Sequence, residues 1–440
     1  RGELGLLPDL SATPVAEPRN LEPLPLVLKP STILAQADSR INEAERLLEK
    51  GHQQLETSQF QAALQSYQQA LYLYRELVTQ PDLFQESRQG EGHALRWIGN
   101  VYLNSAQYEQ AIDLYEQAFE IAREIDDRDG ESRALNNLGI AYRTLGQYQR
   151  AINFYEQALV IFRELGGRAE EGIALGNLGV AYNSLGQYQR AINFHEQALV
   201  IFREIGDRAG EGAALGNLGS AYNNLSQYER AIDFYEQSLA IAREVGDSPE
   251  ERLRQRAGEG AALGNLGVAY DSLGQYERAI GFYEQRLAIA RELGDRAGEG
   301  AALNNLGNAY NNLGQYPRAI DFYEQYLMIA RELGDRAGEG AALNNLGIAY
   351  DSLGQYPSAI DFLEQQLAIT REIDNRAGEA YALGNLGNAF ANLGQDDRAL
   401  EQYGQAVALF NELGARTEEA TVLSNIGILL NRQNQPELAI

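Results

Sequence analysis

The chain has 440 residues and a formal net charge of −26, from 36 basic and 62 acidic residues. This acidic excess argues against nucleic acid and anionic membranes as partners, because both attract basic proteins. The absence of cysteine excludes disulfides, thiolate metal sites and a cysteine nucleophile. No apolar run reaches the roughly 18 residues that would indicate a membrane-spanning helix.

Residues 1–43 form a proline-rich lead before the first regular pattern. Six of the eleven prolines lie within residues 1–40, where no helical periodicity is found. This composition predicts a mostly disordered segment. Residues 24–37 end in Ala-Gln-Ala and are weakly similar to a signal peptide, but Lys29 and two prolines interrupt the apolar run. We therefore expect a cytoplasmic protein, with export as the alternative.

From residue 44 onward the chain is dominated by an internal repeat. One recurring asparagine marks a period of 40 residues, and a single interval of 48 contains eight extra residues, 248–255. We call these asparagines the ladder positions. They are Asn137, Asn177, Asn217, Asn265, Asn305, Asn345, Asn385 and Asn425. Such self-similarity is the signature of a solenoid, in which each unit buries its apolar face only against its neighbours.

Each repeat contains the pattern of two amphipathic helices. In one copy, apolar residues at helical spacing run from Leu135 to Leu145, and a second stripe runs from Tyr148 to Phe162. A glycine-containing break separates the two stripes, and a Gly-Asp-Arg-Ala-Gly turn, residues 206–210 in one copy, leads to the next repeat. The pattern predicts an all-α fold, an α-α superhelix of antiparallel helix pairs.

This pattern resembles the tetratricopeptide repeat. The residues that carry the resemblance are Leu138, Gly139 and Tyr142, then Gly146, Tyr148, Ala151 and Ile152, then Tyr155 and Ala158. The 40-residue form is similar to the arrays of kinesin light chains and Pins-type spindle-orientation adaptors, and to bacterial arrays that precede a caspase-like CHAT domain. The resemblance covers residues 44–440 and implies nine helix pairs with a truncated tenth. Arg163 replaces a proline of the family pattern, so we expect a longer second helix.

The inserted residues 248–255 have a local signal of their own. Ser248 is followed three positions later by Glu251, which is the spacing of a capping box. We expect about two added helical turns, or a protruding loop. The insertion is interpreted either as a partner contact or as an insertion that a surface simply tolerates.

The face of each first helix opposite its core is the candidate binding surface, which we call the inner wall. The ladder position and the residues four before, three after and seven after it lie within about 60° of one another on a helix. These places are nearly uncharged, and asparagine offers both a donor and an acceptor. We predict that a peptide or protein segment binds along this concave groove. Beyond the ladder, the predicted partner-binding asparagines are Asn224, Asn308, Asn312 and Asn388.

Two arginines suggest an acidic anchor for such a partner. Pins-type adaptors grip acidic groups with arginines four residues before the ladder position. This chain has alanine there in four successive repeats, but Arg133 keeps the arginine, and Arg143 flanks the same wall. We predict that both contact an acidic group of the partner. The alternative is that both are solvated and paired with local glutamates.

The sequence offers little for catalysis. The three histidines are His52, His93 and His195; His195 replaces a core tyrosine, and none has the spacing of paired metal ligands. The repeated carboxylates are interpreted as solvated faces and charges at helix ends. We expect no enzyme activity, no cofactor and no metal.

Three functions remain open at this stage. The first is a scaffold that binds a protein or peptide in the groove. The second is a regulatory or sensor array for a C-terminal effector, such as a caspase-like domain, absent from this chain. The third is a structural spacer that self-associates through its open C-terminal repeat, because a solenoid end without a polar cap exposes an apolar face.

Overall fold

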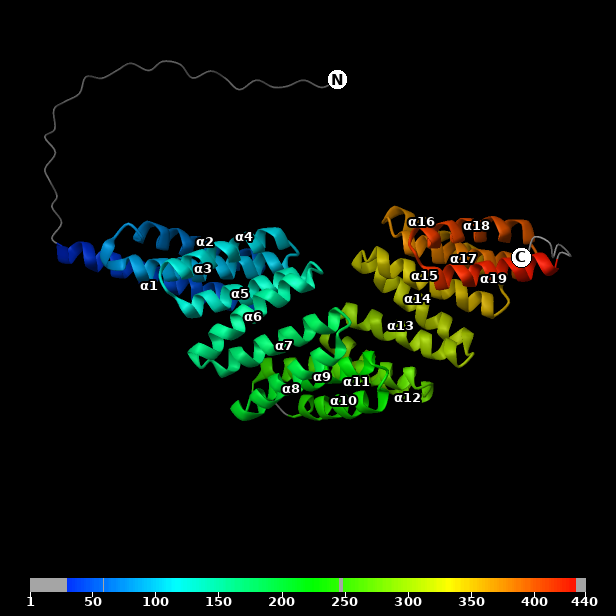
Figure 1. The fold of residues 1–440 in the computed structure, drawn as a ribbon, viewed down its shortest axis with the longest axis horizontal. Helices are drawn as coiled ribbons and strands as arrows, with labels where there is room; N and C mark the ends of the chain where they lie inside the picture. Colours follow the sequence, from blue (N-terminus) through cyan, green and yellow to red (C-terminus); the bar gives the residue numbers. More distant parts are fainter. Residues whose placement is uncertain (1–29, 58, 245–247, 433–440) are drawn as a thin grey trace, which may run out of the picture. The chain divides into compact units, whose positions relative to one another are not determined.

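The computed structural model describes residues 30–57, 59–244 and 248–432. This part of the chain contains nineteen α-helices, one short 3-10 helix and no strand (Figure 1). The α-helices are α1 (Pro30–Glu56), α2 (Phe60–Leu77), α3 (Phe84–Asn104), α4 (Tyr108–Glu124), α5 (Arg128–Thr144), α6 (Tyr148–Leu165), α7 (Arg168–Ser184), α8 (Tyr188–Ile205), α9 (Arg208–Asn224), α10 (Tyr228–Ala242), α11 (Pro249–Ser272), α12 (Tyr276–Leu293), α13 (Arg296–Asn312), α14 (Tyr316–Leu333), α15 (Arg336–Ser352), α16 (Tyr356–Glu372), α17 (Arg376–Asn392), α18 (Asp396–Glu412) and α19 (Arg416–Arg432). The 3-10 helix is η1 (Pro81–Leu83).

The described helices confirm the predicted fold class. They form nine consecutive pairs, α1 with α2 through α17 with α18, followed by α19. The chain divides into two compact units, residues 1–126 and 127–440. Within each unit, a helix packs against its pair partner and against the first helix of the next pair. None of the described helices combines the length and the hydropathy that a membrane span requires.

The turn between repeats is shorter than the sequence pattern predicted. Gly206 ends α8 in the left-handed region, with φ 72°, where a residue without Cβ is unstrained. The carboxylate of Asp207 then accepts a hydrogen bond from the backbone N–H of Gly210 at 2.9 Å. This N-cap satisfies an amide at the start of the helix, so α9 begins at once, at Arg208. The expected five-residue turn at 206–210 is therefore two residues followed by the first turn of a helix.

Small residues let the two helices of a pair approach closely. Gly139 of α5 faces the ring of Tyr155 on α6, which is fully buried. A second contact stacks Tyr142 on Phe154, with ring centroids 5.4 Å apart and planes inclined by 4°. The same stack recurs in the next pairs along the array. In each stack, one ring comes from the first helix of the pair and the other ring from the second helix.

Two sequence expectations about helix ends are confirmed. The side chain of Ser248 accepts a hydrogen bond from the backbone N–H of Glu251 at 3.0 Å, and α11 begins at Pro249. Other first helices begin nine residues before the ladder asparagine, so the insertion lengthens α11 by about two turns. Beyond the replaced family proline, α6 continues past Arg163 to Leu165.

The lead differs from its prediction where it is described. Residues 30–43, expected to belong to a mostly disordered segment, lie in α1, which begins at Pro30. Proline is well suited to the first turn of a helix, since its fixed φ is helical and its missing N–H has no intrahelical partner there. The proline count therefore misplaced this boundary. Residues 1–29 lie outside the described part, as do residues 433–440 of the truncated tenth repeat.

Candidate functional site

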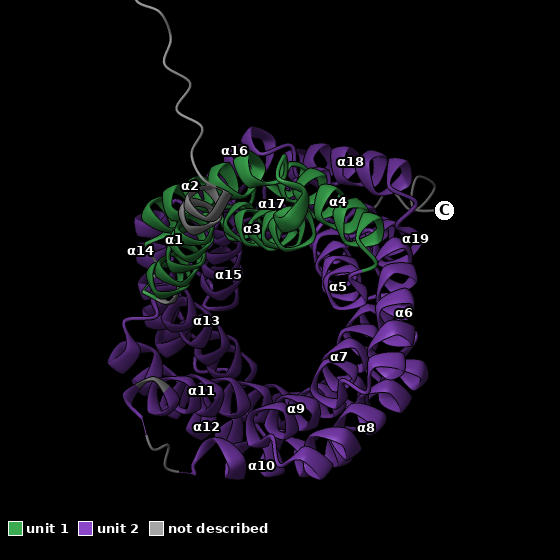
Figure 2. Ribbon diagram, turned by 90° about the vertical axis from the view of Figure 1, so that its left-hand side faces the viewer, with its two compact units in different colours: residues 1–126 green, residues 127–440 purple. Residues whose placement is uncertain are grey.

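The inner wall of the second unit lies on its odd-numbered helices. In Figure 2, α5, α7, α9, α11, α13, α15 and α17 line the inside of the curve that residues 127–440 follow, and α6, α8, α10 and α12 lie outside them. This is the placement expected for the first helix of each repeat. The ladder asparagines are partly exposed, whereas the leucine that follows, such as Leu218 or Leu306, is fully buried.

Several ladder asparagines are paired with another asparagine inside the chain. Each donates from Nδ2 to the Oδ1 of the residue 41 positions earlier. These bonds run from Asn177 to Asn136 at 3.0 Å, from Asn345 to Asn304 at 2.9 Å, and from Asn385 to Asn344 at 2.9 Å. A ladder side chain thus faces the residue just before the ladder position of the preceding first helix. Asn137 is also engaged within the chain.

At three successive ladder positions the facing residue is glycine instead. The pairs are Asn217 with Gly176, Asn265 with Gly216, and Asn305 with Gly264. Among the described residues, these three asparagine amides have no hydrogen-bond partner. We call them the open section of the ladder. Their amides carry donors and acceptors that the fold does not use.

The other predicted asparagines serve the protein internally. Buried tyrosines donate to two of them, Tyr323 to Asn308 at 2.8 Å and Tyr403 to Asn388 at 2.7 Å, and Asn425 donates to Asn388 at 3.1 Å. Asn224 donates to Asn183 at 3.1 Å, and Asn312 lies near Asp271, whose pKa burial raises and Asn312 lowers. Binding of a partner by these residues stays a prediction, and it would have to share or replace these bonds.

Of the two arginines of the predicted acidic anchor, Arg133 is already engaged in ion pairs and Arg143 lies near a buried tyrosine. Arg133 donates from Nε to Asp129 at 2.8 Å and from a terminal nitrogen to Glu170 of the next repeat at 2.9 Å. For Arg133, the structure therefore agrees with the alternative stated in the sequence analysis, in which the arginine pairs with local acidic residues. Burial raises the pKa of Tyr155 to about 12, and the nearby guanidinium of Arg143 acts in the opposite direction. Arg143 therefore lies against a core tyrosine.

An arginine that the sequence analysis did not single out lies beside the open section. Arg286 extends from α12 toward α11, so that a methyl group on Gly264 would come within 2.8 Å of its Cδ and 3.0 Å of its Cζ. Arg286 is partly buried, and no other described residue forms an ion pair with it. Since Gly264 faces Asn305, a positive charge lies next to an open amide. A departure from the repeat pattern was the available signal, because other second helices carry alanine, serine, tyrosine or glutamine at this place.

A network of arginine and glutamate, also missed from sequence, joins successive repeats. Glu339 of α15 is only 6% exposed; Arg331 donates to it at 2.7 Å, and Arg336 binds both Glu339 and Glu372. Burial alone would raise the pKa of Glu339, but the bonds from the two arginines outweigh it and hold the pKa below its ordinary value. The equivalent glutamates are Glu91, Glu171, Glu211, Glu259, Glu299 and Glu379. The interpretation of repeated carboxylates as solvated is therefore wrong for this set.

One of the three histidines, His195, is a buried core residue, as the sequence predicted. His195 is 1% exposed, and burial lowers its pKa to about 4, so the ring is neutral at pH 7. His52 and His93, although in different repeats, line one cavity between α1 and α3. Among the residues that the structure describes, no cluster of three or more histidine and carboxylate side chains is placed to hold a metal ion.

Comparison with known proteins agrees with this architecture. A tetratricopeptide-repeat family model matches residues 91–164, 170–244 and 298–372, and two further tetratricopeptide-repeat models match residues 262–297 and 380–413. No curated protein matches the chain in sequence.

Solved structures with the same fold include two proteins described as sensors. One is a signal-transduction ATPase with numerous domains (STAND) from Pyrococcus horikoshii with a tetratricopeptide-repeat sensor, at TM-score 0.59 and 15% identity. The match covers 82% of this chain and 55% of that one, so the chain spans about half of that protein's length. The quorum sensor NprR of B. thuringiensis matches at TM-score 0.57 and 16% identity, over 86% of this chain and 99% of that one.

A third solved structure is a putative kinesin light chain from Podospora anserina with nearly identical repeats. It matches at TM-score 0.39 and 24% identity, over 46% of this chain and 95% of that one. The family models together match more than half of the residues. With its helix pairs and ladder positions, the chain belongs to the tetratricopeptide-repeat family.

Proposed function

We propose that this chain is a protein-interaction scaffold that binds an extended segment of a partner along the inner wall of its second unit. The observation that carries the proposal is the open section at Asn217, Asn265 and Asn305. These amides are held on neighbouring helices with unused donors and acceptors. A peptide main chain offers the complementary groups at regular intervals.

The residues around the open section also suit a main chain that approaches closely. The residue four positions before each of these ladder asparagines is alanine, whose short side chain leaves space for a partner main chain. These residues are Ala213, Ala261 and Ala301. A methyl group on Gly176 would meet no atom within 4 Å. Arg286 supplies a positive charge at one end of the section, so we propose a partner segment with an acidic group there. This places the anchor at Arg286 instead of the paired Arg133.

Two triple substitutions test where the partner binds. One replaces the ladder asparagines of the open section, and the other replaces paired ladder asparagines as a control. A peptide would first be selected on the full chain from a random display library, and its affinity then measured by calorimetry. The test variant replaces Asn217, Asn265 and Asn305 by alanine. The control replaces Asn177, Asn345 and Asn385, which are already paired, in the same way.

The expected result is selective loss of binding in the test variant. Each lost hydrogen bond is worth about 0.5–1.5 kcal/mol, so three predict a loss of tenfold or more. The control should change the affinity little. Gly176→Asn should also weaken binding, since the new side chain can pair with Asn217 as Asn136 pairs with Asn177. Equal losses in both triple variants would refute a special role for the open section.

A sensor array coupled to an effector is the second candidate. Both sensor proteins named above share this fold, and we propose the cytoplasm as the compartment for either function. A caspase-like domain with a histidine and cysteine pair, encoded downstream in the same reading frame, would favour the sensor. Cell fractionation tests the compartment. The self-associating spacer stays a prediction, to be tested by light scattering at increasing protein concentration.

A further inference from the structure

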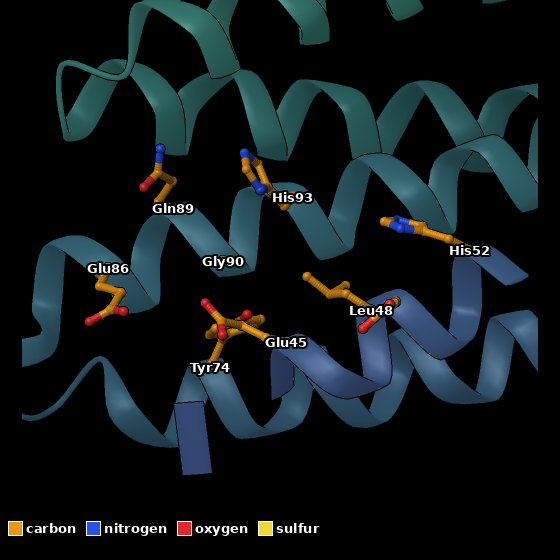
Figure 3. A pocket seen from close by; sticks show the side chains of 9 residues that line it. Glu45, Leu48, His52, Tyr74, Glu86, Gln89, Gly90 and His93 are labelled. Carbon is orange, nitrogen blue, oxygen red and sulfur yellow. The ribbon is translucent and has the colours of Figure 1, made fainter. Parts of the chain in front are cut away.

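A cavity in the first unit contains no residue of the open section. It has a volume of about 330 Å³ and opens between α1, α2 and α3 (Figure 3). Glu45, Leu48 and Glu49 reach it from α1, Tyr74 from α2, and Glu86 from α3. His52, Gln89 and His93 also line it, so the cavity combines three carboxylates with one apolar side chain, one phenol, one amide and two imidazoles.

Tyr74 forms the buried part of this cavity. It is 3% exposed, and its hydroxyl has no hydrogen-bond partner among the described residues. Its ring lies against Gly90, where a methyl group would come within 2.6 Å of Cδ1. The same place holds alanine or phenylalanine in seven other second helices, for example Ala122 and Phe162, and threonine, Thr370, in α16. Packing at this place therefore does not generally require a phenol, and the hydroxyl of Tyr74 is left available to the cavity.

The three glutamates make the cavity strongly negative. Glu45, Glu49 and Glu86 are exposed, and no described residue forms an ion pair with them. Glu45 and Glu49 are one helical turn apart, a spacing at which like charges repel. Burial raises the pKa of Tyr74 to about 12, and Glu45 and Glu86 both add to the increase, so both carboxylates lie near the phenol. A cation bound here would relieve this repulsion.

We propose that the cavity is a binding site for a primary alkylammonium group. The ammonium carries three donors, which the carboxylates of Glu45 and Glu86 and the phenol oxygen of Tyr74 can accept. The aliphatic stem lies along Leu48. A lysine side chain of a partner and a free polyamine present the same group. The site does not depend on the groove proposed above.

Calorimetry with the full chain tests this site. The probes are cadaverine and Nα-acetyl-lysine methylamide, with the Nε-acetylated form of the lysine probe as the uncharged comparison. The variants are Glu45→Gln with Glu86→Gln, and Tyr74→Phe, which keeps the ring. The control is Glu156→Gln with Glu196→Gln, two exposed glutamates of α6 and α8 that change the net charge equally. Circular dichroism and thermal melting establish that each variant is folded.

The proposal predicts saturable binding that the acetylated probe lacks. A hydrogen bond to a charged group is worth about 1.5–3 kcal/mol, so Tyr74→Phe should weaken binding about tenfold or more, and the double glutamine variant more strongly. The control should bind like the parent. Tighter binding of cadaverine would identify a free polyamine, and tighter binding of the lysine probe a partner side chain. Equal binding by all variants, or no saturable binding, would overturn the proposal.

Discussion

The contact between Gly267 on α11 and Tyr283 on α12 gives the sharpest test of the packing. A methyl group at position 267 would lie 2.6 Å from Cδ1 and 2.9 Å from Cζ of Tyr283, and closer still to Cε1. Carbon atoms in contact are normally about 3.5–4.0 Å apart, so the ring must shift by roughly 1 Å. Tyr283 is 3% exposed and has little space to move into. Overpacking of this kind costs about 1–3 kcal/mol.

The control lies in the same helix pair. A methyl group on Gly281 would meet no atom within 4 Å. Because alanine is the better helix former by about 1 kcal/mol, Gly281→Ala should stabilise the chain by nearly that amount. Gly267→Ala has the same gain in propensity, so the difference between the two variants, about 1–3 kcal/mol, measures the clash itself.

Urea unfolding of the whole chain, followed by hydrogen exchange in α11 and α12, measures both effects. A weakened pair contacts only its neighbours, so faster exchange should be concentrated around it. If Gly267→Ala stabilised the chain as much as Gly281→Ala does, the ring would be free to move and the assigned packing would be wrong.

Three further predictions follow from the same structure. Tyr323→Phe should cost about 1 kcal/mol in urea unfolding by removing the bond to Asn308, whereas Tyr283→Phe should be nearly neutral, because that hydroxyl has no partner among the described residues. The pKa of Glu339 is lowered in the folded state, so its contribution to stability is present above its ordinary pKa of 4.5 and is lost as the pH falls through the lowered value. Melting temperatures should therefore fall below about pH 4.5, and less steeply in Glu339→Gln. Ser248→Ala should cost about 1 kcal/mol, seen as faster hydrogen exchange in the first turns of α11.

The repeat pattern was sufficient to predict the fold. Apolar residues at helical spacing, with a glycine after most stripes, predicted the alternation of two helices in each repeat. Ser248 and Glu251 correctly predicted the lengthened helix α11. The start of α1 was not predicted, because the prolines of the lead were counted as a sign of disorder. Pro30 is in fact the first residue of α1. The same residue type has opposite meanings at a helix start and in its interior.

The connections between repeats could not be predicted from one repeat alone. Arg336 reaches Glu372, which is 36 residues away, and Asn345 reaches Asn304, which is 41 residues away. Such pairs depend on how neighbouring helices are staggered, and periodicity does not give that stagger. With the stagger known, the sequence reveals which ladder positions face asparagine and which face glycine. The first helices lie on the inside of the second unit as expected, but their ladder positions are less uniform in chemistry than predicted, and binding along them stays a prediction.

Gly176, opposite Asn217 of the open section, is difficult to explain by the fold alone, whereas a side chain at Gly264 would clash with Arg286. Glycine inside a helix is about 1 kcal/mol less favourable than alanine. At Gly139 the close approach of Tyr155 accounts for it, since a side chain would clash with the ring. At Gly176 a methyl group would meet nothing within 4 Å, so packing does not require glycine there. Glycine at that place instead leaves Asn217 without the partner that Asn136 gives Asn177. An unfavourable residue with no packing role, facing an amide with no partner, is the combination expected where a ligand occupies the space.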